Sequence, residues 1–340
     1  MKIVIPGGSG QVGTMVARAF HEEGHEVVVL GRRPRTMPWQ TVEWDGARLG
    51  PWMKILDGAD VLLNLTGRSV NCRYTAANRR EIVDSRVGST RILGQALTEV
   101  HRPPAVWLQA STATIYAHRY DAANDEITGI IGGDEVDAPD TWRFSIDVAQ
   151  AWELAFSEVQ APATRKVTLR SAMTMSADRG GVFDALLALV RRGQGGRIGD
   201  GRQFMSWVHE ADFIRAVHWL IAHEEIDGIV NIASPNPMPN DEFMRALREA
   251  WGIRVGLPTA EWMIEIGALF LRTESELVLK SRRVVPRRLL ERGFVFAYPH
   301  WPDAARDLCR DWLTRRGGGA YTPTRAQRPQ RPTPESATSR

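Results

Sequence analysis

Lysine and tyrosine are scarce in this chain of 340 residues. The four lysines are Lys2, Lys54, Lys166 and Lys280, and the five tyrosines are Tyr74, Tyr116, Tyr120, Tyr298 and Tyr321. No tyrosine is followed by a lysine four residues later. The sequence therefore excludes any chemistry in which a tyrosine acts as acid or base beside a lysine one helical turn away.

Cysteine and long apolar runs are also rare. The two cysteines, Cys72 and Cys309, lie far apart without metal-ligand spacing, so neither a disulfide framework nor a metal site is predicted. The chain has no run of about 18 uncharged apolar residues, so no membrane span is expected. Its opening residues lack the apolar core and cleavage site of a signal peptide. We therefore expect a cytoplasmic protein.

Excess positive charge is confined to one end of the chain. The formal net charge is +3, but residues 315–340 contain six arginines and one acid, so the remaining residues carry about −2. A body without a basic surface does not predict nucleic-acid binding. Residues 315–340 are rich in Gly, Pro, Arg and Thr and almost free of apolar side chains, a composition typical of a disordered tail.

A glycine-rich loop stands near the start of the chain. The apolar run KIVIP at 2–6 leads into GGSGQVG at 7–13, and a helical pattern follows. In this context Gly7 permits the tight turn, Gly10 lets the backbone approach a pyrophosphate, and Gly13 lets the helix pack on the strand. Free N–H groups at the start of the helix favour a phosphate. The pattern predicts a dinucleotide-binding loop; a merely tight turn is the alternative.

The second strand-like run, EVVVL at 26–30, is followed by Arg32 and Arg33. An acid at this point holds the ribose 2′-hydroxyl of NAD, whereas arginine suits the 2′-phosphate of NADP. We therefore predict NADP as the cofactor, with NAD less favoured. The alternative is a pair of solvated arginines.

Strand-like and helical runs alternate along the body. The strand-like runs are 2–6, 26–30, 41–44, 61–65, 105–111, 166–170 and 229–233, and the helical runs are 75–99, 142–158, 182–192, 211–223, 240–251 and 259–280. Continuous apolar strands between helices predict a parallel sheet covered on both faces. We assign 1–170 to this unit, completed by about 205–233. We assign 171–204 and 234–314 to a substrate-side lobe.

Several segments resemble the extended and atypical short-chain dehydrogenase/reductases, the superfamily of sugar-nucleotide epimerases and dehydratases. They are GGSGQVG at 7–13, NLTG at 64–67, SRVGSTRIL at 85–93 and STATIYA at 111–117. Segments 199–217, 230–243 and 282–299 resemble one subfamily of NAD-dependent epimerase-like proteins with a C-terminal domain of unknown function and no assigned reaction. The resemblance covers residues 1–314. It implies an α/β fold of the Rossmann type, a doubly wound parallel sheet of about seven strands, with a smaller C-terminal lobe.

The resemblance also implies which residues contact the cofactor. They are Gly7, Gly10, Gln11, Val12, Gly13 and Arg32, then Asp45 near the adenine, Leu65, Thr66 and Gly67 beside the ribose, and Ser111 near the nicotinamide. Thr112 takes the position of the family's catalytic Ser or Thr. This chain departs from the family at Arg86, where asparagine is usual. The water relay that the family builds on that helix therefore lacks its usual residue here.

In the same family a tyrosine and a lysine four residues later act as the general acid and base. Aligning Trp152 and Glu153 puts these two positions on Phe144 and Val148. Phenylalanine cannot transfer a proton, and valine can neither lower a pKa nor hold the nicotinamide ribose. The usual reaction of the family is therefore not expected from these two residues.

Five other residues are candidates for catalysis or substrate binding. Thr112 and Tyr116 follow a strand at the expected crevice, and Tyr116 either donates a proton or simply packs. His209 either binds substrate or is a buried, hydrogen-bonded histidine. Arg197 and Arg202 lie in a glycine-rich loop and suit an anionic ligand, with a solvated loop as the alternative.

Three functions follow from these observations. The first is an NADP-binding oxidoreductase-like or epimerase-like protein that acts on an unknown small substrate, for which an anionic compound is one option. The second is a non-enzymatic sensor, in which NADP occupancy alters the binding of a partner. The third, an ordinary nucleotide-sugar epimerase, is disfavoured by the absent tyrosine and lysine. A homodimer is left open.

Overall fold

The central feature of the protein is a parallel sheet of seven strands in the order β10-β6-β5-β4-β1-β2-β3. The computed structural model describes residues 1–135, 139–258 and 280–317. The strands are β1 (Lys2–Pro6), β2 (Glu26–Gly31), β3 (Gln40–Glu43), β4 (Val61–Asn64), β5 (Val106–Thr112), β6 (Arg165–Ser171) and β10 (Gly228–Ile232). Because β1 pairs with β2 on one side and β4 on the other, the winding direction changes at β1. Ligands bind at such a switch point, beyond the carboxyl ends of the strands.

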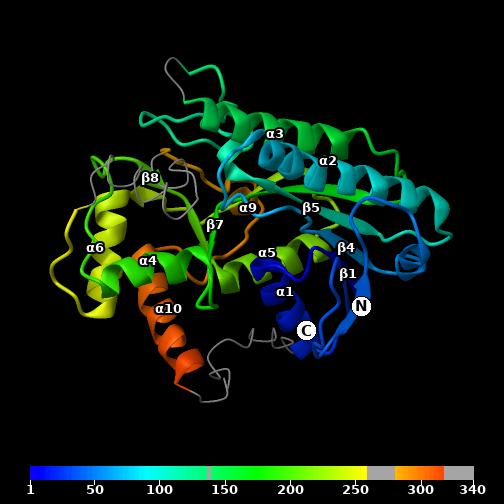
Figure 1. The fold of residues 1–340 in the computed structure, drawn as a ribbon, viewed down its shortest axis with the longest axis horizontal. Helices are drawn as coiled ribbons and strands as arrows, with labels where there is room; N and C mark the ends of the chain where they lie inside the picture. Colours follow the sequence, from blue (N-terminus) through cyan, green and yellow to red (C-terminus); the bar gives the residue numbers. More distant parts are fainter. Residues whose placement is uncertain (136–138, 259–279, 318–340) are drawn as a thin grey trace, which may run out of the picture.

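Helices cover both faces of this sheet, as Figure 1 shows. One face packs against α1 (Gln11–Glu22) and α5 (Glu210–Ala222), and the other packs against α2 (Ala76–Glu99) and α3 (Asp140–Ser157). Alternate strand residues point to opposite faces, so Ile3 joins the first core and Val4 the second. Burial of both faces explains why these strands are continuously apolar.

A smaller unit with its own core lies at one end of the sheet (Figure 1). Its helices are α4 (Val182–Arg191), α6 (Asn240–Trp251) and α10 (Trp301–Arg316). Trp301 stacks on Phe243 with 3.9 Å between ring centroids and also contacts Trp207. Large aromatic rings supply much of the apolar area that such a small core needs.

Several short elements complete the described structure. They are the strand pairs β7 (Met173–Met175) with β9 (Trp207–His209) and β8 (Phe204–Met205) with β11 (Met238–Pro239), the 3-10 helices η1 (Pro51–Ile55) and η2 (Ala113–Ile115), and the helix α9 (Arg287–Glu291). Within the described residues, no helix is both long and apolar enough to cross a membrane.

The predicted fold class is confirmed: a doubly wound parallel sheet of seven strands with a smaller C-terminal lobe. The proposed boundaries between the two units stay a prediction. One segment differs from them, because Leu289 of α9 joins the core under the sheet although it falls within 234–314. The helix predicted over 259–280 lies outside the described residues, apart from Lys280.

The prediction of a disordered tail is wrong for its first two residues, Arg315 and Arg316. The helix α10 continues to Arg316, and the Arg315 guanidinium contacts three carboxylates, those of Asp178, Glu210 and Asp311. Composition alone misses this end of the helix, because two of the three acids that pair with Arg315, Asp178 and Glu210, lie far away in sequence. Residues 318–340 lie outside the described part of the chain.

Candidate functional site

The three spaced glycines of the loop between β1 and α1 are glycine for different reasons. Gly7 has a φ of 75°, and a Cβ atom there would lie 2.7 Å from the Leu65 carbonyl carbon. A Cβ atom on Gly13 would lie 2.4 Å from the Gly8 Cα atom. Gly10 has an ordinary φ of −76°, and a Cβ atom there would meet only the Gly7 oxygen, at 3.5 Å. The protein's own packing does not require glycine at position 10, so the position leaves room for a ligand.

The helix α1 presents an open N-terminus at this loop. Gly10 is the N-cap residue, no side chain caps the helix, and its first turn has no acidic residue. The first N–H groups of a helix lack partners inside the helix and carry partial positive charge. This is the arrangement that binds phosphate.

Two buried polar atoms beside the loop have no hydrogen-bond partner among the described residues. They are Nε2 of Gln11 and Oγ1 of Thr66. A buried polar group without a partner costs about 1–3 kcal/mol, so such groups indicate a missing ligand or water. Both residues belong to the predicted cofactor contacts. Val12, which is also predicted, packs its side chain against the core under the sheet, so only its backbone faces the loop.

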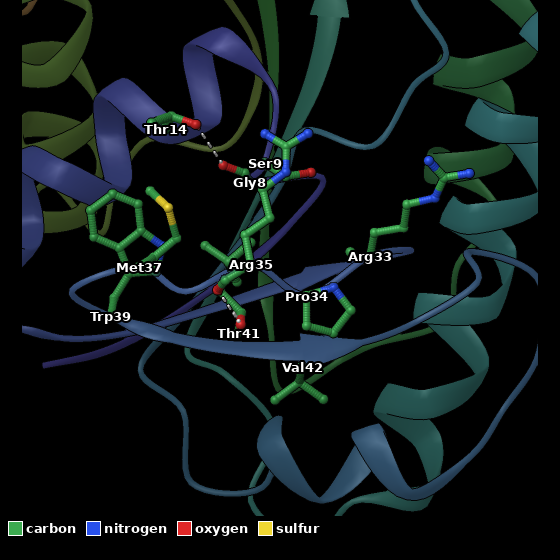
Figure 2. A pocket seen from close by; sticks show the side chains of 12 residues that line it. Gly8, Ser9, Thr14, Arg33, Pro34, Arg35, Met37, Trp39, Thr41 and Val42 are labelled. Carbon is green, nitrogen blue, oxygen red and sulfur yellow. Dashed lines mark hydrogen bonds between the residues drawn. The ribbon is translucent and has the colours of Figure 1, made fainter.

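A hollow lined by arginine opens next to the glycine loop. Ser9, Arg32, Arg33 and Arg35 line it, and all four are exposed. Figure 2 shows the guanidinium group of Arg35 beside Ser9 at the loop, while Arg33 extends away from it. The sequence analysis predicted Arg32 and Arg33 but missed Arg35. The run RRPR at 32–35 contained the signal, because its third arginine also lines the hollow beside the loop.

The loops after β3 and β4 hold the other predicted contacts. The Leu65 N–H donates to the Pro6 oxygen at 2.9 Å, and the Thr66 N–H donates to Asn64 Oδ1 at 3.0 Å. The first bond joins the start of the β4 loop to the end of β1, and the second fixes the β4 loop locally. Asp45 is exposed, and its Oδ1 accepts bonds from the N–H groups of residues 47 and 48, so the carboxylate already stabilises a turn.

The end of β5 carries Ser111 and Thr112. The Ser111 hydroxyl donates to Glu153 Oε1 at 2.6 Å, and the same carboxylate holds the Arg170 guanidinium through two bonds of 2.8 and 2.7 Å. Thr112 is half-buried, and its Oγ1 donates to Thr114 Oγ1 at 3.0 Å. The structure thus places both hydroxyls at the carboxyl edge of the sheet, with Ser111 bound to an internal acid.

Tyr116 is a packed residue. It is 2% exposed, and its hydroxyl donates to Asn231 Oδ1 at 2.9 Å. Burial raises the pKa of Tyr116, against the opposing effect of Arg170. This geometry favours the packing alternative over the proton donor for Tyr116.

His209 is also a structural residue. It is 2% exposed, its Nδ1 caps α5 by accepting from the Ala211 N–H at 3.1 Å, and its Nε2 lies 3.4 Å from Asp307 Oδ2. Its ring stacks on Tyr298 with centroids 3.9 Å apart. Because both ring nitrogens face protein groups, the geometry favours the buried histidine over a substrate ligand.

Arg197 and Arg202 lie exposed on the loop between α4 and β8. The Arg202 guanidinium carbon lies 5.9 Å from the ring centroid of Tyr120, and the backbone N–H of Arg202 donates to Asp200 Oδ1 at 2.9 Å. The loop is tied to α6 by the Ile198 N–H, which donates to Asn240 Oδ1. The two arginines stay candidates for an anionic substrate.

Phe144 and Val148, which align with the family's tyrosine and lysine, both lie on α3. Val148 is buried, with 6% exposure. The Tyr74 ring packs edge-on against Phe144, with centroids 5.0 Å apart, and its hydroxyl lies 3.4 Å from Ser145 Oγ. Arg86 lies against Trp152 of the same helix, with its guanidinium carbon 5.2 Å from the ring centroid. Sequence reasoning missed Tyr74, because the contact joins a loop to a helix 70 positions later.

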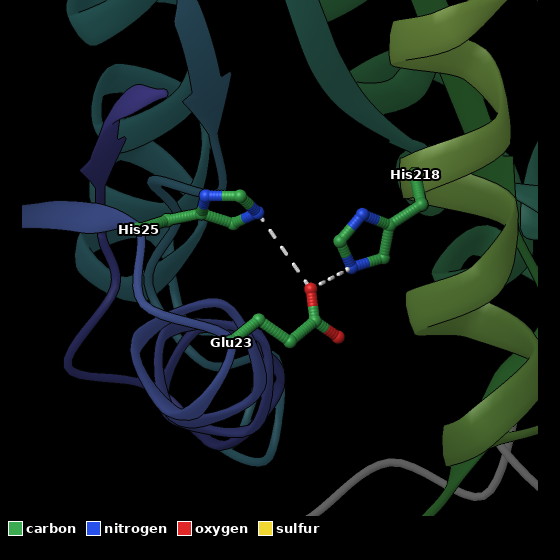
Figure 3. A group of neighbouring side chains, drawn as sticks. All are labelled: Glu23, His25 and His218. Carbon is green, nitrogen blue, oxygen red and sulfur yellow. Dashed lines mark ion pairs between the residues drawn. The ribbon is translucent and has the colours of Figure 1, made fainter. Parts of the chain in front are cut away.

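A separate cluster lies where α1 ends and β2 begins. Figure 3 shows the Glu23 carboxylate between the rings of His25 and His218. Its Oε2 lies 3.0 Å from His218 Nε2 and 3.7 Å from His25 Nε2, and potential ligand atoms of all three lie within 4.8 Å of one another. Burial lowers the pKa of His218, although Glu23 opposes the effect. The Glu23 carboxylate already contacts both imidazole rings, so this cluster takes part in the packing of α1, β2 and α5.

A doubly wound sheet whose glycine loop opens at the carboxyl end of its central strand defines a dinucleotide-binding protein of the Rossmann type. The chain belongs to the NAD dependent epimerase/dehydratase family, whose model matches residues 3–233. A domain of unknown function, DUF1731, matches residues 259–308. The predicted family is thereby confirmed.

Relatives match along almost the whole chain. The epimerase family protein SDR39U1 of Homo sapiens is 27% identical over 311 residues, which cover 91% of this chain and 99% of that protein. The epimerase family protein YfhF of Bacillus subtilis is 26% identical over 317 residues, or 92% of this chain and 100% of that protein. The crystal structure of human SDR39U1 (isoform 2) with NADPH has a TM-score of 0.78 at 26% identity, covering 92% of this chain and 100% of that one.

Proposed function

We propose that the protein binds NADPH across the carboxyl edge of its sheet and acts as an oxidoreductase-like or epimerase-like enzyme on a small substrate. The observation that carries the proposal is the pair of buried polar atoms without partners, Gln11 Nε2 and Thr66 Oγ1, beside an open helix N-terminus. Solved human SDR39U1 contains NADPH, which supports the same cofactor here.

In this proposal, different residues around the loop bind different parts of the cofactor. The N-terminus of α1 and Gly10 hold the pyrophosphate, while Arg32, Arg33 and Arg35 bind the 2′-phosphate. Thr66 and Gly67 line the ribose, and Ser111 and Thr112 border the nicotinamide. When bound, the nicotinamide supplies or accepts a hydride; the protein positions the substrate and moves the proton.

Cofactor titration of arginine variants tests this proposal. We expect Arg32→Ala and Arg35→Ala each to weaken NADPH binding about 10- to 100-fold, because a hydrogen bond to a charged group contributes about 1.5–3 kcal/mol. NADH binding should change little, since NADH lacks the 2′-phosphate. Fluorescence transfer from tryptophan to the reduced nicotinamide measures both affinities.

The matched control is Arg306→Ala, which removes an exposed arginine of α10 that pairs with Asp303. It should leave both affinities unchanged. Equal affinities of the wild type for NADPH and NADH would overturn the assignment of the arginine hollow.

A sensor without enzymatic activity is the second candidate. Phe144, Val148 and the buried Tyr116 favour it. Phe144 and Val148 carry no proton that can be transferred, and the Tyr116 hydroxyl is buried and donates to Asn231. Substrate-dependent turnover of bound NADPH across a panel of metabolites separates the two functions. A sensor would bind NADPH and change partner affinity, but it would oxidise no NADPH with any compound.

A further inference from the structure

The cluster of Glu23, His25 and His218 has the composition of a metal site. Each residue offers one ligand atom, and the three atoms lie within 4.8 Å of one another. Figure 3 shows the two imidazole rings pointing at the carboxylate from two sides. Imidazole nitrogen suits zinc and related transition metals, whereas calcium and magnesium prefer oxygen ligands. The donor atoms therefore indicate a divalent transition metal.

The spacing of these donors fits a single ion. The Glu23 Oε2 atom lies 3.0 Å from His218 Nε2 and 3.7 Å from His25 Nε2. Ligand atoms on a tetrahedral zinc ion lie about 3.3 Å apart, because each lies about 2.0–2.1 Å from the metal. Both measured distances differ from that value by no more than about 0.4 Å. Small rotations of the side chains are therefore enough to bring the three atoms onto one ion.

A hydrogen bond between Glu23 and His218 does not account for their contact. The Nε2 atom of His218 is shielded from solvent and has no hydrogen-bond partner among the described residues, although the Glu23 oxygen lies 3.0 Å away. The two atoms are close without the alignment that a hydrogen bond needs. Two ligands of one ion have this relationship, because their lone pairs point at the metal and not at each other. The buried nitrogen thus points to a bound ion independently of the residue types.

Packing around the cluster holds the three side chains in place. Glu23 and His25 flank Gly24, whose φ of 85° turns the chain from α1 into β2. The His25 N–H closes this turn by donating to the Phe20 oxygen at 3.0 Å. The His218 ring stacks on the Phe20 ring, with centroids 4.0 Å apart and planes at 11°. Ligands that are held before the metal arrives lose little conformational freedom on binding.

The cluster is also accessible to an ion from solvent. The side-chain exposures are 24% for His25, 29% for His218 and 47% for Glu23. The Met1 nitrogen contacts His25 at Nδ1, at 3.5 Å, and leaves Nε2 to the cluster. Burial lowers the pKa of His218, with Glu23 opposing, so the ring is neutral at about pH 7, as a metal ligand must be.

This position is remote from the proposed cofactor site. The helix α1 has 12 residues and begins with Gln11 at the glycine loop, so it is about 18 Å long. The cluster lies beyond its other end, where β2 starts, whereas dinucleotides bind at the carboxyl ends of the strands. A metal here would link α1, β2 and α5 and would take no part in hydride transfer.

We propose that Glu23, His25 and His218 form a binding site for one zinc ion, which stabilises the packing of α1 and β2 against α5. Water completes the coordination shell, because solvent reaches the cluster. The inference does not depend on the proposed binding of NADPH.

Calorimetric titration with zinc chloride tests the site. Protein without a histidine tag is treated with a chelator and exchanged into metal-free buffer before the titration. We expect one zinc ion per chain. Glu23→Gln, His25→Gln and His218→Gln should each weaken zinc binding by about 10- to 100-fold or more, since loss of a residue that merely supports a ligand costs that much. His101→Gln removes an exposed histidine outside the cluster and should bind zinc as the wild type does.

Two further measurements guard against a variant that simply fails to fold. Circular dichroism in the presence of chelator should give wild-type spectra, above all for Glu23→Gln, whose site is exposed and whose side chain keeps its size. X-ray absorption of the zinc-loaded wild type counts the imidazole ligands without any variant, and we expect two.

The zinc site is wrong if the wild type binds no zinc, if all three variants bind zinc as tightly as the wild type, or if fewer than two imidazoles coordinate the ion. NADPH affinity of Glu23→Gln should equal that of the wild type. Zinc binding by a protein that does not bind NADPH would support the site and overturn only the proposed function.

Discussion

At the scale of single residues, substitutions of Gly10 and Gly13 are expected to have opposite effects on ligand binding and stability, although both residues belong to one motif. A Cβ atom on Gly10 has room within the protein, whereas a Cβ atom on Gly13 would lie 2.4 Å from the Gly8 Cα atom. We expect Gly10→Val to abolish NADPH binding and change the melting temperature little. We expect Gly13→Ala to lower the free energy of unfolding by about 1–3 kcal/mol, the usual cost of overpacking.

Thermal unfolding and NADPH titration of the two variants check this contrast. The prediction is contradicted if Gly10→Val still binds NADPH, because the loop would then not approach a pyrophosphate. It is also contradicted if Gly13→Ala is as stable as the wild type.

The sequence predicted these residues because their roles depend on neighbours along the chain. A glycine spacing and an arginine after a strand are local signals. The states of Tyr116 and His209 depend instead on distant partners, namely Asn231 and Asp307. Tyr74 and Arg86 belong to the same class, since Phe144 and Trp152 of α3 give them their surroundings. Sequence reasoning named Arg86 only as a departure from the family.

At the scale of elements, local periodicity was sufficient for most helices. The helix predicted over 240–251 matches α6 (Asn240–Trp251), and the helix predicted over 75–99 matches α2 to within one residue. Two described helices, α9 and α10, were not predicted, and α10 is the longer of them. Its apolar residues, such as Trp301 and Trp312, find partners only in the core of the lobe, and its C-terminal end depends on ion pairs.

The cluster that joins α1, β2 and α5 predicts a dependence of stability on pH. The folded-state pKa of His218 is lowered by burial, with Glu23 opposing and His25 adding to the effect. The unfolded chain therefore takes up a proton on His218 at a higher pH than the folded protein does. This contribution to stability is present above the unfolded pKa, about 6.5, and is lost as the pH falls towards the folded pKa.

Chemical unfolding at about pH 7.5 and about pH 5.5 checks this effect. The loss of unfolding free energy on acidification should be smaller in His218→Gln, because the glutamine places a polar amide near Glu23 but cannot titrate. His101→Gln, which removes an exposed histidine, should lose as much as the wild type does. An identical loss in all three proteins would show that His218 does not carry the pH dependence.

At the scale of the whole molecule, one ion network connects the sheet to the C-terminal helix. Arg315 of α10 donates to Asp178 at 2.7 Å and pairs with Glu210 at the start of α5. Asp178 also receives Arg18 of α1 at 2.6 Å. These groups are largely shielded from water, with side-chain exposures of 19% for Arg315 and 8% for Glu210. Such pairs are costly to break from one side, because the remaining charge stays buried.

Two truncations therefore differ in their expected effect. Residues 318–340 contain no Val, Ile, Leu, Met, Phe or Trp, so their removal should change the free energy of unfolding by less than about 0.5 kcal/mol. Removal of 315–340 also takes Arg315 from Glu210 and Asp178, and it should cost about 1.5–3 kcal/mol, the range for hydrogen bonds to charged groups. The full-length variant Arg315→Met should reproduce most of that loss, which separates the ion network from chain length. Equal melting temperatures for the two truncations would show that the network does not hold α10 to the sheet.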